Sequence, residues 1–232
     1  MNALQRLMLD FVALLFPELC PACGTGLHHG EGDICLHCLF DLPYTDYHLH
    51  QDNRVARQFW GRLPLHAAMA MLYFKKGTKV QHLVHHLKYK GRTAVGIKLG
   101  QLLAERLKQS EQYQDVDLII PVPLHPKKQK LRGYNQSEYI AKGMAEEMNI
   151  PFSTLHLRRL KASATQTKKS RYYRYENMRD IFSLSKAEQM QDLHILLVDD
   201  VVTTGATLEA CGQVLLNSPI KKLSIAAVAF AE

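Results

Sequence analysis

The chain has 232 residues, enough for one sizeable α/β domain and a small additional module. Hydrophobic residues make up 47% and charged residues 22%, which is ordinary for a soluble globular protein, and no segment is long and apolar enough for a transmembrane span. The net charge of +7 predicts a polyanionic ligand or partner.

The first predicted element covers residues 1–16, where apolar side chains recur at helical spacing. Arg6 and Asp10 interrupt any apolar core, and no small-residue cleavage site follows. We therefore expect an amphipathic helix that docks on the body of the protein rather than a signal peptide. The expected location is the cytoplasm, with any membrane association provided by partners. The apolar residues are Leu4, Leu7, Met8, Phe11, Leu14 and Leu15.

Two C-x-x-C pairs come next, Cys20 with Cys23 and Cys35 with Cys38, and 11 residues separate the inner two cysteines. Each pair can place two thiolates on one tetrahedral ion, so the two pairs predict a closed structural zinc site. Two disulfides are the alternative, which the lack of a visible secretion signal disfavours. A redox Cys-x-x-Cys is less favoured still, because no strand and helix pattern surrounds it. Nearby candidate substitute ligands are His28, His29 and His37.

Three regions are expected along the chain: the amphipathic helix and zinc-ribbon module at 1–42, a polar and aromatic linker at 43–63, and the main domain at 64–232. In the main domain, apolar runs alternate with helical patterns, which favours an α/β fold with a doubly wound, mostly parallel sheet. Strands are predicted over 66–74, 117–123, 155–157, 195–198 and 223–230, and helices over 78–87, 93–108, 136–148 and 206–216.

The most informative segment covers residues 195–208. Its apolar strand is followed by Asp199 and Asp200 at the carboxyl end, where ligands bind in open α/β sheets. A glycine-containing turn then opens a helix whose free N–H groups suit a phosphate, while the acid pair suits vicinal sugar hydroxyls or magnesium held through water. The segment thus predicts a ribose 5-phosphate site; the plain alternative is a turn with solvated acids. The predicted phosphate-binding residues are Thr203, Thr204, Gly205, Ala206 and Thr207.

Three basic segments are candidate ligand-binding surfaces, with a solvated charged surface as the alternative for each. One lies at 88–92, between two helices. A second, at 127–136, is expected to bring Arg132, Asn135 and Gln136 to the sheet edge that carries the acid pair. The third, at 158–179, mixes eight cations with three tyrosines, which suits phosphate contacts and base stacking. The residues assigned there to nucleic acid are Arg158, Arg159, Lys168, Lys169, Arg171, Tyr172, Tyr173 and Arg174.

Residues 195–208 closely resemble the phosphoribosyl pyrophosphate (PRPP) signature of the type I phosphoribosyltransferases. In those enzymes a short loop at the chain position of the first basic segment holds the pyrophosphate of PRPP. The resemblance therefore implies that magnesium enters together with PRPP and that this loop contacts the substrate. The residues concerned are Lys88, Tyr89, Lys90, Gly91 and Arg92.

An ordered set of motifs over nearly the whole chain resembles the ComF family, which includes the GntX branch. The set consists of Leu-Phe-Pro-x-x-Cys-x-x-Cys at 15–23, the runs at 87–92, 121–124 and 132–136, the spacing over 165–177, and the PRPP signature. This resemblance implies a zinc ribbon on a type I phosphoribosyltransferase-like fold. It also implies a role in handling DNA taken up by the cell, in natural transformation or in the use of DNA as a nutrient.

Two classes of function remain open. In the first, the protein binds PRPP or another ribose phosphate together with single-stranded DNA, and DNA-uptake or recombination proteins are candidate partners. In the second, it is an active phosphoribosyltransferase that transfers the ribose phosphate of PRPP to an unidentified base or amine. Asp199 and Asp200 would then act catalytically by stabilising the positive charge that develops on the ribose ring. A regulator that senses PRPP is a third option, and such sites are often reused.

Overall fold

The structure is a computed structural model that describes residues 17–28, 30–160 and 181–231. The predicted amphipathic helix at 1–16 lies outside the described residues, as does His29. So do six of the residues assigned to nucleic acid: Lys168, Lys169, Arg171, Tyr172, Tyr173 and Arg174.

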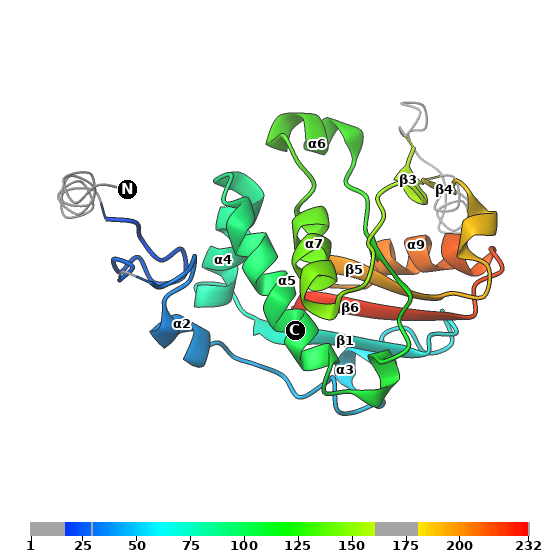
Figure 1. Ribbon diagram of the computed structural model, residues 1–232, viewed down its shortest axis with the longest axis horizontal. Coiled ribbons are helices and arrows are strands. Elements are labelled where there is room, and N and C mark those ends of the chain that lie inside the picture. The colour runs from blue at the N-terminus through cyan, green and yellow to red at the C-terminus, as the bar shows by residue number, and fades with distance from the viewer. Residues whose placement is uncertain (1–16, 29, 161–180, 232) are drawn as a thin grey trace.

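Four parallel strands form the central sheet, in the order β1-β6-β5-β2 (Figure 1). Nearly every residue of the three longer strands is buried, because helices cover both faces, as is usual for parallel sheets. The predicted α/β class with a parallel sheet is therefore confirmed. The strands are β1 (Ala67–Phe74), β2 (Leu118–Pro121), β5 (His194–Val202) and β6 (Lys222–Ala231).

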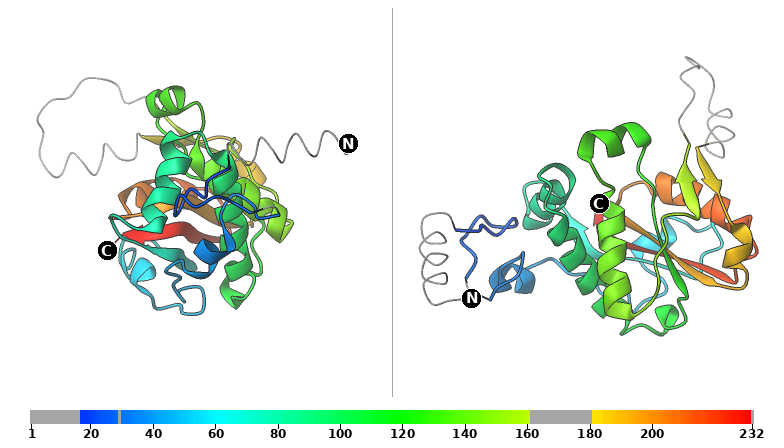
Figure 2. Two further views of the ribbon diagram at one scale, coloured as in Figure 1. Left: turned by 90° about the vertical axis from the view of Figure 1, so that its left-hand side faces the viewer. Right: turned by 45° about the horizontal axis from the view of Figure 1, so that its top comes forward.

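Helices α4 (Lys79–Tyr89), α5 (Thr93–Leu107) and α7 (Gln136–Met148) lie on one side of the sheet, and α9 (Ala206–Leu216) lies on the other (Figures 1 and 2). Helices α5 and α7 approach each other closely at two glycines. A Cβ atom at Gly100 or at Gly143 would lie 2.1 Å from a backbone carbonyl oxygen of the facing helix. Only glycine fits there. Within the ranges that the structure describes, every helix is too short or too polar to span a lipid bilayer.

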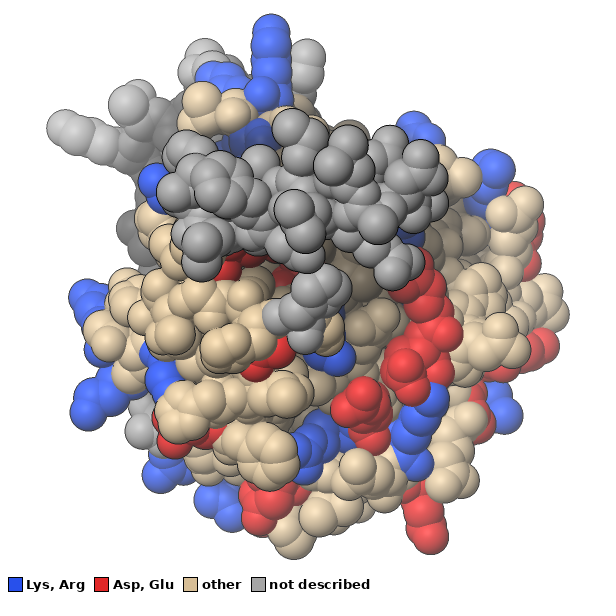
Figure 3. All heavy atoms as spheres, turned by 60° about the vertical axis from the view of Figure 1, so that its left-hand side comes forward, with Lys and Arg blue, Asp and Glu red and all other residues tan. Residues whose placement is uncertain are grey.

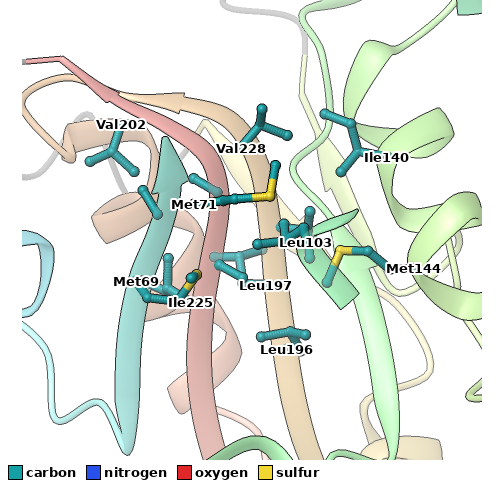
Figure 4. Close-up of a cluster of buried hydrophobic side chains, with 14 of the residues drawn as sticks. Met69, Met71, Leu103, Ile140, Met144, Leu196, Leu197, Val202, Ile225 and Val228 are labelled. Atoms are coloured by element: carbon teal, nitrogen blue, oxygen red, sulfur yellow. The ribbon is translucent and has the colours of Figure 1, made fainter. Parts of the chain in front are cut away.

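The hydrophobic core extends over both faces of the sheet, against α5 and α7 on one side and α9 on the other. Strands and helices both contribute to the cluster shown in Figure 4. Each labelled side chain is at most 1% exposed, so the sheet that carries the predicted site is supported by a closely packed hydrophobic core. The labelled residues are Met69, Met71, Leu103, Ile140, Met144, Leu196, Leu197, Val202, Ile225 and Val228.

Several smaller elements lie around this layered body. The sequence did not predict the helix α6 (Pro126–Arg132), nor strand β4 (Phe182–Leu184), which pairs antiparallel with β3 (Leu157–Arg159). Strand β3 begins two residues later than predicted. The remaining elements are helices α2 (Leu36–Phe40) and α3 (Arg54–Arg57) and the 3-10 turns η1 (Glu111–Tyr113) and η2 (Ala187–Met190).

Residues 43–63, interpreted from sequence as a linker, pack along β1. The Asn53 amide donates to the Ala68 carbonyl oxygen at 2.8 Å, and the Thr45 hydroxyl donates to the Ala70 carbonyl oxygen at 2.6 Å. Phe59 is 1% exposed. These buried hydrogen bonds fix the segment to the domain edge, and the boundaries at 42 and 63 stay predictions.

Candidate functional site

The acid pair lies within β5, at a point where one neighbouring strand has ended. Strand β5 runs four residues further than predicted because β6 continues beside it, pairing Asp199 with Ala227. On the other edge, β2 ends at Pro121, opposite Val198. From Asp199 onward, that edge of β5 is open to side chains from helices.

Asp199 is held from the start of α7. The Ser137 hydroxyl donates to Asp199 Oδ1 at 3.0 Å, and the backbone N–H of Asp200 donates to the same oxygen at 2.8 Å. Burial, together with repulsion from the Asp200 carboxylate, raises the pKa of Asp199 to about 7. Near neutral pH, a ligand that prefers the ionised carboxylate therefore has a proton to displace.

Asp200 is 4% exposed, and one of its two carboxylate oxygens accepts a hydrogen bond. Its Oδ1 accepts from Lys88 Nζ at 2.8 Å, whereas its Oδ2 is buried with no hydrogen-bond partner among the described residues. Buried carboxylate oxygens are almost always hydrogen-bonded. An oxygen left over at a sheet edge suits a ligand hydroxyl or Mg²⁺, so the pair fits the predicted diol or metal role.

The loop that follows β5 forms a small hollow of about 40 Å³ lined by Asp199 and residues 201–208. Gly205 has φ 72°, and a Cβ there would lie 2.9 Å from the Phe59 ring, so only glycine fits. Gly205, the N-cap residue of α9, provides no side-chain cap, and the Ala206 N–H makes only a long contact of 3.4 Å with Thr204 Oγ1. The start of α9 therefore retains donor capacity for an anion in the hollow. Thr203, Thr204 and Thr207 are exposed beside them. The geometry is that of an anion site.

The segment before β1 braces this loop. The Gln58 amide donates to the Thr203 carbonyl oxygen at 2.9 Å, and Arg62 donates to the Thr204 carbonyl oxygen at 3.4 Å. Arg62 also forms an ion pair with Glu209 of α9. Sequence reasoning missed both residues, and no local pattern could have found them, since their partners lie more than 140 positions away.

A basic cleft of about 380 Å³ opens beside the acid pair, between the end of α4 and α6. Lys88 and Tyr89 occupy the last turn of α4, so only residues 90–92 of the predicted loop connect two helices. The Arg132 guanidinium lies 5.3 Å from the centre of the Tyr89 ring. The lining residues are Lys88, Tyr89, Gly91, Lys128, Leu131, Arg132 and Tyr134.

Two residues predicted to bind substrate are buried and already hydrogen-bonded. Asn135 is 1% exposed; its side chain caps α7 and donates to the Val122 carbonyl oxygen at 2.9 Å. Gln136 is 6% exposed and accepts a hydrogen bond from Arg132. Both position the start of α7, whereas Ser137, which the sequence did not single out, contacts the acid pair.

The two described residues that were assigned to nucleic acid lie on β3. Arg158 is exposed, and the Arg159 guanidinium lies 5.2 Å from the centre of the Phe182 ring on β4. Their assignment to nucleic acid stays a prediction.

The four cysteines of the two C-x-x-C pairs come together. Their Sγ atoms all lie within 4.8 Å of one another, and those of Cys23 and Cys35 are 3.8 Å apart. Tetrahedral zinc with thiolates at about 2.3 Å requires sulfur atoms separated by about 3.8 Å. The described cysteines form no disulfide. The residues Cys20, Cys23, Cys35 and Cys38 therefore fit a zinc ion.

Helix α4 connects this cysteine cluster to the acid pair. At its start, Lys79 Nζ lies 2.6 Å from Asp41 Oδ2, and the His82 ring nitrogen lies 3.1 Å from the carbonyl oxygen of Ala22. At its end, Lys88 reaches Asp200. One helix thus touches both candidate sites.

Comparison with known proteins agrees with this geometry. Residues 135–232 match the Phosphoribosyl transferase domain family. The chain is 34% identical over 139 residues to DNA utilization protein YhgH of Salmonella typhimurium, covering 59% of this chain and 60% of that protein. It is 29% identical over 221 residues to YhgH of Escherichia coli O157:H7, covering 88% of this chain and 93% of that protein. Competence protein F of Haemophilus influenzae is 29% identical over 147 residues, covering 62% and 64%.

The similarity to DNA utilization and competence proteins agrees with the resemblance to the ComF family expected from the sequence. The chain spans 60% of the length of the Salmonella typhimurium relative. Among solved structures, glutamine PRPP amidotransferase from B. subtilis aligns with a TM-score of 0.44 at 19% identity, covering 62% of this chain and 30% of that chain. Adenine phosphoribosyl transferase from Trypanosoma brucei aligns with a TM-score of 0.41 at 14% identity, covering 78% and 70%.

Proposed function

We propose that this protein binds PRPP at the carboxyl edge of its sheet. The observation that carries the proposal is the placement of a helix start whose N-cap is glycine directly beside an acid pair in which Asp200 Oδ2 has no hydrogen-bond partner among the described residues. The 5-phosphate would bind to residues 203–207, and the ribose hydroxyls to Asp199 and Asp200. A phosphate cradle and a diol-binding acid pair at one strand end together match a ribose 5-phosphate.

The pyrophosphate of PRPP would lie toward the basic cleft. Lys88 is its first contact, because its ammonium already lies at the boundary between the acid pair and the cleft. A bound pyrophosphate competes with Asp200 for Lys88, which frees the second acid for a hydroxyl or for Mg²⁺. The residues proposed for this part of the ligand are Lys88, Tyr89, Lys90, Gly91, Arg92 and Arg132.

We further propose that the PRPP site serves the handling of DNA taken up by the cell, with binding of single-stranded DNA. The relatives carry DNA utilization and competence in their names. The net charge of +7 supports a polyanionic partner. Retained phosphoribosyltransferase activity on a small base or amine is the alternative, and DNA-uptake or recombination proteins remain candidate partners.

The cysteine cluster is proposed to hold a structural zinc ion. The fit of the four sulfur atoms supports it, and so do two N–H donors: the N–H of Cys35 points to Cys20 Sγ at 3.5 Å, and that of Cys38 to Cys35 Sγ at 3.4 Å. Such donors stabilise thiolate charge around a metal.

A thermal-shift titration tests PRPP binding. PRPP with Mg²⁺ should raise the Tm of the wild type by mass action, and the double variant Asp199→Asn/Asp200→Asn should lose the shift. A wild type that shows no shift at millimolar PRPP contradicts the proposal. Pyrophosphate release from PRPP, measured with a panel of bases and amines, then separates the binding function from the transferase alternative.

A further inference from the structure

Helix α6 contributes nothing to the core. It has seven residues, and none of its side chains is buried. Leu131 is 91% exposed, and Tyr89, across the cleft, is 66% exposed. An exposed leucine and tyrosine that line one cleft are not explained by packing, so this surface is available to a ligand.

The residues that line this cleft include cations and no acid, and one of these cations, Lys88, forms an ion pair with Asp200 of the neighbouring acid pair. The chain has no Asp or Glu between Asp52 and Glu105, nor between Asp117 and Glu138, and these two stretches supply both walls of the cleft. Elsewhere the charges mix, as Figure 3 shows for one face where acidic and basic side chains are interspersed. The cations that line the cleft are Lys88, Lys128 and Arg132, and the same two stretches also carry Lys90, Arg92, Lys127 and Lys130.

We propose that the cleft between α4 and α6 is a binding site for single-stranded nucleic acid. The exposed lysines of α6 would contact successive phosphates, and a base would stack in the cleft on Tyr89 beside Leu131. A ligand that needs both a cationic track and an apolar aromatic platform is a chain of nucleotides with unpaired bases. A duplex hides its base faces, and pyrophosphate has none, so neither uses the platform.

This inference rests on the DNA-handling part of the proposed function and gives it a location. Lys88, Tyr89, Gly91 and Arg132 line the cleft and are also proposed for the pyrophosphate of PRPP, whereas the lysines of α6 are not. This location also differs from the one predicted from sequence, because neither Arg158 nor Arg159, the two described residues assigned there to nucleic acid, lines the cleft. The cleft adjoins the acid pair through Lys88, which brings the nucleic acid beside the sugar-phosphate site.

Fluorescence anisotropy with a labelled 20-mer of thymidine tests the proposal over a salt series. The variant Lys128→Ala/Lys130→Ala should weaken binding and flatten the plot of log K against log salt by about 1.4, since each lysine contributes about 0.7 for single strands. The matched control Lys142→Ala/Lys221→Ala removes two exposed lysines outside the cleft and should leave the slope unchanged.

The stacking platform has its own pair of variants. Tyr89→Ala should weaken binding of the single strand on the order of tenfold at every salt concentration, whereas Tyr89→Phe, which keeps the ring, should bind like the wild type. Neither change should alter weak binding to a duplex of the same length.

Equal effects of the two lysine pairs would overturn the proposal, because binding would then follow net charge alone. Failure of the wild type to bind the 20-mer at low salt would overturn it as well. A PRPP-induced Tm shift that persists in Lys128→Ala/Lys130→Ala shows that this variant is folded, whereas the Tyr89 variants, which alter a residue proposed for PRPP, are checked by their Tm without ligand. The persistent shift also shows that failure of this inference leaves the PRPP site standing.

Discussion

The cysteine cluster and the loop at residues 203–207, called here the phosphate loop because phosphate is proposed to bind there, are both short, irregular segments. Different forces hold them in place. Around the cluster, the ordered structure is one helix of five residues and a few buried side chains such as Ala22 and Ile34. The phosphate loop lies between a central strand and α9 and rests on the buried ring of Phe59. We therefore expect the first region to depend on a metal for its shape, whereas the second is shaped by the domain before any ligand binds.

Loss of the metal should give the largest effect. Structural zinc contributes about 10–16 kcal/mol of apparent binding free energy to a small module, so Cys38→Ser should lose zinc and unfold residues 17–42. Elemental analysis and limited proteolysis measure both outcomes. Cys211→Ser is the matched control, because Cys211 is an equally buried thiol in α9. Full zinc content in Cys38→Ser would show that the cluster is not the ligand set.

A substitution at Gly205 should affect the preformed region most. The Gly205→Ala variant combines a left-handed backbone with a Cβ placed against Phe59, which should destabilise the protein by about 2 kcal/mol and abolish the PRPP-induced Tm shift. Gly77→Ala is the control: Gly77 also has a positive φ, but a Cβ there meets nothing within 4 Å. Its stability should fall less, and its PRPP response should survive. Equal PRPP responses in the two variants would contradict the placement of the phosphate.

The pH dependence tests the acid pair. Because the pKa of Asp199 is raised from 3.8 to about 7, the folded protein holds this proton more tightly than the unfolded chain does. This contribution to stability is present below pH 4 and is lost as the pH rises through 7.

PRPP binding should show the opposite trend, tightening about tenfold from pH 6 to pH 8 as Asp199 ionises. Calorimetric titration at several pH values measures it. Asp199→Asn retains an acceptor for Ser137 and should remove the pH dependence of Tm assigned to this group. The same pH dependence of Tm in wild type and variant would show that another group titrates.

The brace on the phosphate loop should have the smallest effect. Gln58→Ala removes one hydrogen bond to the Thr203 carbonyl oxygen and should cost about 1 kcal/mol of stability, with a severalfold loss in PRPP affinity. Gln51→Ala, an exposed glutamine in the same segment, is the control and should leave PRPP affinity unchanged. Wild-type PRPP affinity in Gln58→Ala would show that the loop needs no brace.

The sequence predicted the features that depend on local pattern. Apolar runs predicted the sheet strands, and the two C-x-x-C pairs predicted a cluster that the folded chain assembles. It missed contacts formed by residues far apart along the chain: Gln58 with Thr203, and Lys88 with Asp200. Asn135 was predicted to bind substrate because it was expected at the sheet edge that carries the acid pair. Its side chain instead caps α7, and local sequence does not show which polar groups form hydrogen bonds within the fold.

Hydrogen exchange of the backbone amides with and without PRPP and Mg²⁺ tests the central claim most directly. The predicted result is slower exchange in residues 203–209 on ligand addition, because a bound phosphate would engage the free N–H groups at the start of α9. Residues 17–42, which hold the cysteine cluster, should exchange at unchanged rates. Unchanged exchange in 203–209 at saturating PRPP, with protection elsewhere, would contradict a phosphate site at this loop.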